Sequence, residues 1–95
     1  MTAADILARI PRRQLQRRNG IILAAEQYGE GLRQMRLSSP AMETAIRDGE
    51  STIKQHCLAA GYTEAEAKDC GRIFKMHCLR WLLNTPAVSK GGMRQ

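Results

Sequence analysis

The residues best suited to chemistry in this sequence are five arginines within ten positions, residues 9 to 18. The segment contains no acidic residue, and its arginines are Arg9, Arg12, Arg13, Arg17 and Arg18. A guanidinium group donates several hydrogen bonds from a planar fork that matches phosphate and carboxylate groups. The segment is therefore predicted to bind the phosphates of a nucleic acid or the carboxylates of an acidic protein. The alternative is an ordinary solvated surface that keeps the protein soluble.

Positive charge is concentrated at the two ends of the chain. Among 95 residues, 15 are Lys or Arg and 9 are Asp or Glu, which gives a net charge of +6. Residues 1–36 contribute +4, residues 37–69 contribute −3, and residues 70–95 contribute +5. Three cations of the last region are expected to join the arginine segment in one continuous positive surface. They are Arg72, Lys75 and Arg80.

A second set of chemically capable residues is a repeated Lys-x-His-Cys-Leu pattern, at residues 54–58 and 75–79. Histidine and cysteine are zinc ligands, but adjacent positions on a helix point about 100 degrees apart, which does not suit one shared ion. The favoured interpretation is that the thiols pack in the core, the histidines lie at its margin, and no metal or other cofactor is bound. The residues concerned are His56, Cys57, Cys70, His77 and Cys78.

The sequence lacks the patterns of an enzyme. It contains no Gly-rich phosphate loop, no pair of carboxylates in an apolar setting and no nucleophile elbow. A cysteine beside a histidine within a helix is a poor nucleophile without a cleft and a lowered thiol pKa. We therefore expect a binding protein and not a catalyst.

Length and composition predict one small domain in the cytoplasm. A chain of 95 residues supports a modest core, and its four aromatic residues leave most of that core to aliphatic and sulfur-containing side chains. Arginines interrupt any apolar leader, and the longest apolar run, residues 21–25, is far shorter than the roughly 20 residues of a membrane span. Three cysteines without close spacing suit a reducing compartment. No membrane contact is expected.

Helix signals predict an all-α bundle of three longer helices plus a short N-terminal helix. Thr2 and Asp5 resemble a capping box for the short helix, and Pro11 is placed to open a second short helical stretch. Asn19-Gly20 is predicted to break the chain before a helix over residues 21–37. The inward face of that helix is marked by apolar side chains at steps of three and four. These are Ile21, Ala25, Tyr28, Leu32 and Met35.

Two further helices have clearer boundary signals. Ser39 is predicted to cap the first of them, and Gly61 to close it. Thr63 and Glu66 form a second capping box, which opens a last helix that is expected to be the central element. This helix is expected to end near residue 83.

The domain is expected to comprise residues 1–86, followed by a flexible basic tail over residues 87–95. Gly29, Gly49 and Gly71 fall on or beside the inner helix faces, where the absence of a side chain permits close packing. Apolar surface left on the last helix is available for pairing with a second copy of the chain.

The junction between the last two helices, residues 58–67, resembles a helix-turn-helix, in which a glycine in the turn precedes a helix that enters the major groove. However, Glu64, Glu66 and Asp69 occupy the start of its second helix, where a DNA reader needs donors for bases and phosphates. The junction is therefore interpreted as a structural helix hairpin.

These patterns together predict a small, non-enzymatic, nucleic-acid-associated regulator or accessory factor that binds the phosphate backbone. The predicted contact residues are Arg9, Arg12, Arg13, Arg17, Arg18, Arg72, Lys75 and Arg80. The alternative is a protein-binding adaptor or inhibitor, whose basic face or apolar helix face binds an acidic or helical partner.

Overall fold

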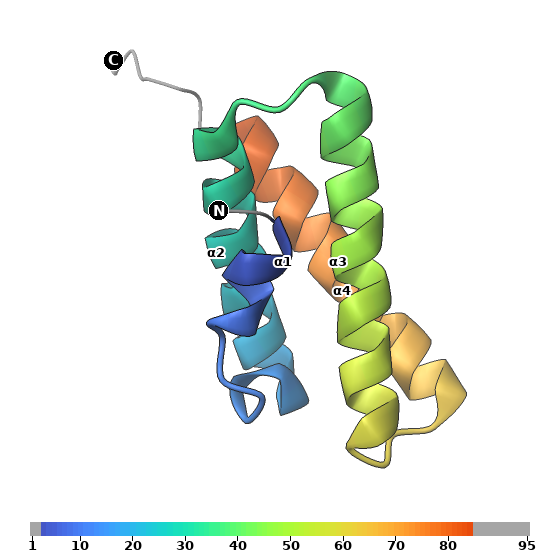
Figure 1. Ribbon diagram of the computed structural model, residues 1–95. Helices are drawn as coiled ribbons and strands as arrows, with labels where there is room; N and C mark the ends of the chain where they lie inside the picture. Colours follow the sequence, from blue (N-terminus) through green and yellow to red (C-terminus); the bar gives the residue numbers. More distant parts are fainter. Residues whose placement is uncertain (1–2, 85–95) are drawn as a thin grey trace.

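A computed structural model describes residues 3–84, and the regular structure in this range is entirely helical (Figure 1). The elements are α1 (Ala3–Ala8), the 3₁₀ turn η1 (Gln14–Gln16), α2 (Arg18–Met35), α3 (Ser39–Ala59) and α4 (Glu64–Asn84). The predicted all-α bundle of three longer helices and a short N-terminal one is confirmed. Thr2 and the predicted tail, residues 87–95, lie outside the described residues.

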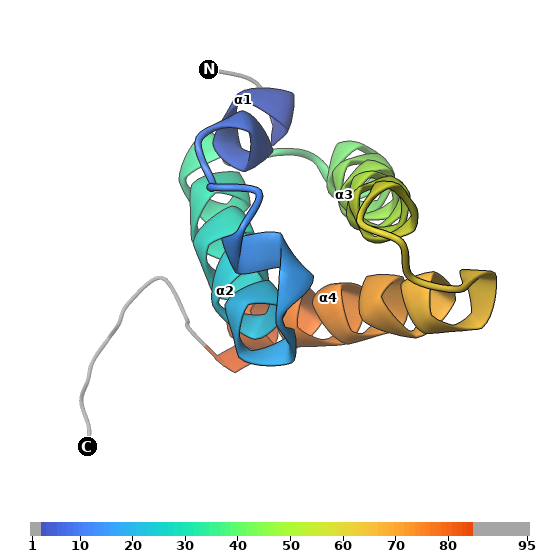
Figure 2. The same ribbon diagram turned by 90° about the horizontal axis from the view of Figure 1, so that it is seen from below.

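The long helices are arranged around α4. Helix α4 packs against both α2 and α3, while α1 and η1 bridge α2 and α3 from the other side (Figures 1 and 2). Seen along α3, α1 and α4 therefore lie at opposite sides of the molecule, with α2 and α3 between them (Figure 2). The last helix, expected to be the central element, contacts both other long helices but lies on one side of the bundle and has an exposed outer face.

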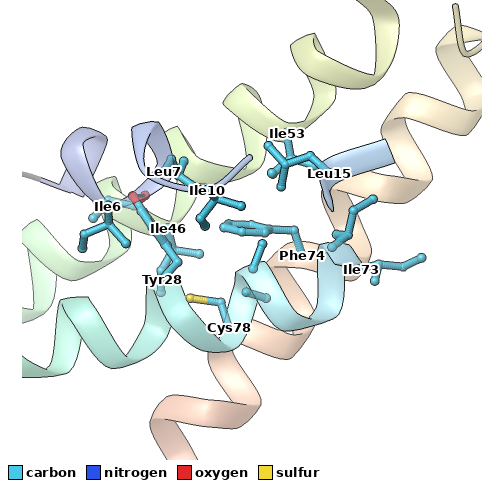
Figure 3. Close-up of a cluster of buried hydrophobic side chains, with 14 of the residues drawn as sticks. Ile6, Leu7, Ile10, Leu15, Tyr28, Ile46, Ile53, Ile73, Phe74 and Cys78 are labelled. Atoms are coloured by element: carbon cyan, nitrogen blue, oxygen red, sulfur yellow. Dashed lines mark hydrogen bonds between the residues drawn. The ribbon is translucent and has the colours of Figure 1, made fainter. Parts of the chain in front are cut away.

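The core forms where the three long helices meet at two aromatic rings (Figure 3). The rings of Tyr28 on α2 and Phe74 on α4 have centroids 5.4 Å apart and are tilted by 49°. The Tyr28 hydroxyl donates a buried 2.6 Å hydrogen bond to the carbonyl of Ala45 on α3. A Cβ atom at Gly49 would lie 2.8 Å from Phe74 Cε2 and 2.9 Å from Tyr28 Cε2, so the predicted close approach at this glycine is confirmed.

Side-chain caps define the start of α3 and of α4. Ser38, and not the predicted Ser39, caps α3, and its hydroxyl accepts a 3.4 Å hydrogen bond from the backbone N–H of Ala41. At α4 the predicted capping box is confirmed in both directions. The Thr63 hydroxyl accepts from the Glu66 N–H at 3.1 Å, and the Glu66 carboxylate accepts from the Thr63 N–H at 2.8 Å.

The N-terminal boundary of α2 was predicted wrongly. Asn19-Gly20 does not break the chain, because α2 begins at Arg18 and includes both residues in its first turn. Pro11 leads only to the short turn η1 and not to a helix. The reason is a tertiary contact: a Cβ atom at Gly20 would lie 1.9 Å from the carbonyl oxygen of Gln14. The glycine allows η1 to pack on α2, and it does not form a turn of its own.

Helix α2 ends at a residue with left-handed backbone geometry. Arg36 has φ 53° and ψ 49°, a region that costs a residue with a Cβ atom about 1 kcal/mol or more. We predict that Arg36→Gly raises the free energy of unfolding by about 0.5 to 1 kcal/mol, because glycine adopts this geometry without that cost. Urea unfolding followed by circular dichroism measures the change. The control Arg47→Gly, inside α3, is expected to lower stability by about 1 kcal/mol.

The Glu30 carboxylate on α2 forms a hydrogen bond with Trp81, near the end of α4. Glu30 accepts hydrogen bonds from Arg33 Nε at 2.9 Å, Gln34 Nε2 at 2.9 Å and Trp81 Nε1 at 3.1 Å. These bonds favour the ionised form, and those from Arg33 contribute most, so the pKa of Glu30 is lowered to about 2. The native state is therefore stabilised by this group at pH values above the ordinary carboxyl pKa. That stabilisation is lost as the pH falls toward 2.

We predict that the melting temperature of the native protein falls more steeply between about pH 4.5 and pH 2 than that of Glu30→Gln, which has no carboxylate to protonate. Differential scanning calorimetry across this pH range measures the difference. Glu43→Gln is the control, since Glu43 is exposed and has no bonding partner among residues 3–84. An identical pH dependence in the Glu30 variant and the native protein would contradict the role of this carboxylate.

Candidate nucleic-acid interface

The arginine-rich residues 9–18 link α1 to α2 and are held in place by Leu15, which is only 1% exposed. The Cys57 thiol on α3 donates to the Leu15 carbonyl over 3.9 Å, and the Tyr62 hydroxyl donates to the carbonyl of Gln16. The Gln14 side chain donates to the Gly20 carbonyl on α2 at 3.2 Å. Contacts from α2, α3 and the α3–α4 turn thus fix a segment that is mostly not helical.

All five arginines of this segment point into solvent, as predicted. They are Arg9, Arg12, Arg13, Arg17 and Arg18. Within residues 3–84 none of them forms an ion pair, and the pair that the structure shows there joins Arg33 to Glu30 on α2. The cationic side chains of the segment are therefore unneutralised and accessible. Only their backbone is held, by the buried Leu15.

The arginines do not all face the same way. Arg12 and Arg13 line one shallow hollow together with Pro11 and Gln16. Arg12 also borders a groove of about 360 Å³ between α1 and α3. Arg9 lies on the other side of the linking segment, in a hollow along α2. Arg12 and Arg13 are therefore the arginines of this segment that share one hollow. Arg17 and Arg18 follow at the start of α2.

The start of α2 adds a second source of positive potential. Arg17 occupies the N-cap position without a side-chain cap, Arg18 is the first helical residue, and the first turn contains no acid. A helix N-terminus carries partial positive charge, so cations there are unfavourable by about 0.3 to 1 kcal/mol each, and a bound anion removes this cost. This arrangement was not predicted, because Asn19-Gly20 was expected to break the chain and instead lies in the first turn of α2.

The cations of α4 lie on a separate helix. Arg72, Lys75 and Arg80 are exposed there, and α4 lies on the opposite side of the molecule from α1 (Figure 2). Lys75 borders a groove that also contains Glu50 of α3. Arg80 borders one that contains Ile22 and Glu26 of α2, which follow Arg18 by one and two turns. Lys75 and Arg80 therefore stand beside carboxylates, and one continuous surface with residues 9–18 stays a prediction.

The repeated His-Cys pairs are part of the packing. Cys57 and Cys78 are completely buried, and burial is the main cause that raises the pKa of each thiol to about 12. A protonated, buried thiol is a poor nucleophile. Cys70, His56 and His77 are half-buried, and residues 3–84 contain no group of three or more His, Cys, Asp or Glu side chains that would hold a metal ion. The predicted core role of the thiols is confirmed.

The α3–α4 junction is a tight hairpin. Gly61 has φ 98°, which a residue with a side chain rarely adopts, and it reverses the chain before α4. The acids at the start of α4 include Glu66, whose carboxylate is engaged in the capping box. The residues that would face a DNA groove are therefore acidic and partly committed to the cap. This geometry supports the interpretation as a structural hairpin.

Comparison with known proteins gave no match to a family model, a curated protein or a solved structure. A search of the described helices for a segment long and apolar enough to span a membrane also found none. The function is therefore inferred from the geometry of the chain's own residues.

The cationic start of α2 yields a prediction about stability. Arg17→Asp places a side-chain acceptor at the N-cap and a negative charge at the positive end of the helix, so we expect the free energy of unfolding to rise by about 1 kcal/mol. Urea unfolding measures this change. Arg47→Asp, an exposed change within α3, is the control and gains no cap. A less stable Arg17→Asp protein would contradict this description of the α2 N-terminus.

Proposed function

We propose that this protein is a small, non-enzymatic, nucleic-acid-associated regulator or accessory factor of the cytoplasm, which binds the phosphate backbone through residues 9–18. The observation that carries the proposal is a set of exposed arginines that form no ion pair within residues 3–84, on a segment anchored by the buried Ile10 and Leu15. Because the backbone is already held in place, binding restricts only the arginine side chains, which lowers the entropic cost of association.

Three features favour phosphate as the ligand. The guanidinium groups match phosphate oxygens in bidentate geometry, and the uncapped N-terminus of α2 adds partial positive charge beside Arg17 and Arg18. Arg12 and Arg13 extend the same cationic surface. The structural hairpin of α3 and α4 begins with acids at Glu64 and Glu66, so nothing in it favours reading base edges. We therefore propose binding that depends little on nucleotide sequence.

The proposed interface centres on residues 9–18. The sequence pattern also grouped Arg72, Lys75 and Arg80 with these residues. Lys75 and Arg80 border grooves that contain carboxylates, Glu50 of α3 and Glu26 of α2, so the proposal gives the α4 cations no phosphate contact.

A salt titration tests the proposal. We expect the logarithm of the affinity for an arbitrary duplex of about 20 base pairs to fall linearly with the logarithm of salt concentration, because bound cations displace counterions from phosphates. Each of Arg12→Ala and Arg13→Ala is expected to reduce the slope by about 1. Fluorescence anisotropy measures both, and Arg47→Ala, exposed on α3, is the control that leaves the slope unchanged.

Two results separate a specific interface from general positive charge. Arg17→Asp is expected to bind DNA more weakly although the protein becomes more stable, a combination that damage to the fold cannot produce. Replacing Arg12 and Arg13 by Lys keeps the charge but removes the bidentate fork, and is expected to reduce affinity. Absence of binding at low salt, or equal losses for the Arg47 control and the Arg12 variant, would rule the proposal out.

A further inference from the structure

The outer face of α4 carries an apolar stripe that residues 3–84 leave uncovered. Met76, Leu79 and Leu83 are 47%, 39% and 80% exposed, and their spacing of three and four places them along one face of the helix. The other large exposed apolar side chains, Leu23 on α2 and Leu58 on α3, belong to other helices. A row of this kind on a small protein is typical of a surface that binds a partner.

The stripe is surrounded by positive charge. Between residues 68 and 83, α4 exposes four cations and a single acid, Asp69. The cations are Lys68, Arg72, Lys75 and Arg80. Lys75 and Leu79 also border a groove of about 410 Å³ between α3 and α4, which is large enough to receive side chains of a partner and whose α3 wall carries Glu43, Arg47 and Glu50. The face thus combines apolar contacts with flanking cations.

We propose that this face of α4 docks an amphipathic helix of another protein, whose own apolar stripe is flanked by Asp and Glu residues. The exposed Met and Leu side chains pack against that stripe, and the cations pair with its acids, so both components of the surface are satisfied. The three apolar anchors cover about 10 Å of helix, so the partner contributes two to three turns.

The charges favour this occupant over the other candidates. A second copy of the chain would bring four cations of each α4 helix together, and Asp69 with the neighbouring Glu43 and Glu50 would offset them only in part. A nucleic acid would engage the cations but leave Met76, Leu79 and Leu83 without apolar contacts. An acidic amphipathic helix avoids both the repulsion between cations and the loss of apolar contacts.

The opposite side of this stretch of α4 packs into the core. Within the same stretch of α4, Cys78 and Phe74 are completely buried, and Trp81 donates its indole N–H to Glu30 on α2. The face therefore needs no rearrangement before binding. The inference extends beyond the proposed function and does not depend on it.

A synthetic peptide tests the proposal with the full chain. The probe is a fluorescein-labelled helical peptide of about 16 residues, with leucines at steps of three and four and glutamates on both flanks. We expect saturable binding in fluorescence anisotropy. Met76→Glu and Leu79→Glu are each expected to weaken it about tenfold, because each places a carboxylate where apolar contact is needed.

The matched controls make the same chemical change elsewhere. Leu23→Glu and Leu58→Glu alter exposed apolar residues on other helices and are expected to leave the affinity unchanged. Leu83→Glu changes the most exposed side chain of the stripe, so it tests the face with the least effect on folding. A peptide with lysine in place of glutamate is expected not to bind.

Several results would overturn the proposal. These are absence of binding by the acidic peptide, equal effects of the stripe and control variants, and equal binding of the lysine peptide. A dimer in analytical ultracentrifugation that Leu79→Glu dissociates would make a second copy the occupant. Peptide binding that appears only after deletion of residues 85–95 would make that segment the occupant. DNA affinity lost on Arg72→Glu, without any peptide binding, would make the face a nucleic-acid surface.

Discussion

The bundle depends on the contact that Tyr28 makes with its two neighbouring helices. Helices α2 and α3 are joined mainly through other elements, and the Tyr28 hydroxyl connects them directly by its hydrogen bond to the Ala45 carbonyl. The same ring packs on Phe74 of α4, and Gly49 leaves the space that both rings need. Burial is the main cause that raises the pKa of Tyr28 to about 12, so the neutral hydroxyl remains a donor throughout the neutral range. One side chain thus sets the distances among three helices.

The arginine segment follows from the space that this arrangement leaves between α2 and α3. On the side away from α4, that space is closed by α1 and η1, and Leu15 is the side chain of η1 that is buried there. Two buried apolar residues among ten positions, Ile10 and Leu15, anchor the segment, and Gly20 lets its backbone approach α2 directly. The arginines on either side of Leu15 are then forced outward. The packing of residues 9–18 between α2 and α3 therefore both closes the core and exposes the arginines.

The molecule has two cationic regions of different character. Residues 9–18 combine arginines with the positive end of α2 and few exposed apolar groups, which suits a polyanion. The outer face of α4 combines cations with Met76, Leu79 and Leu83, which suits a protein helix. If both proposals hold, the domain is an adaptor that contacts a nucleic acid through one region and a protein through the other.

Local sequence determined the helices, their caps and their inner faces. The capping box of Thr63 and Glu66, the reversal at Gly61 and the apolar face of α2 depend only on neighbouring residues, so each could be predicted and is confirmed. The outward direction of the arginines also followed from local pattern. What only the tertiary structure decided is which distant elements meet. Gly20 reads as a turn until η1 packs on it, and no local pattern indicates that Cys57 hydrogen-bonds to the Leu15 carbonyl or that Trp81 hydrogen-bonds to Glu30. The physical reason is that helix formation depends on side chains within a turn or two of each other, whereas these contacts depend on how separate elements pack together.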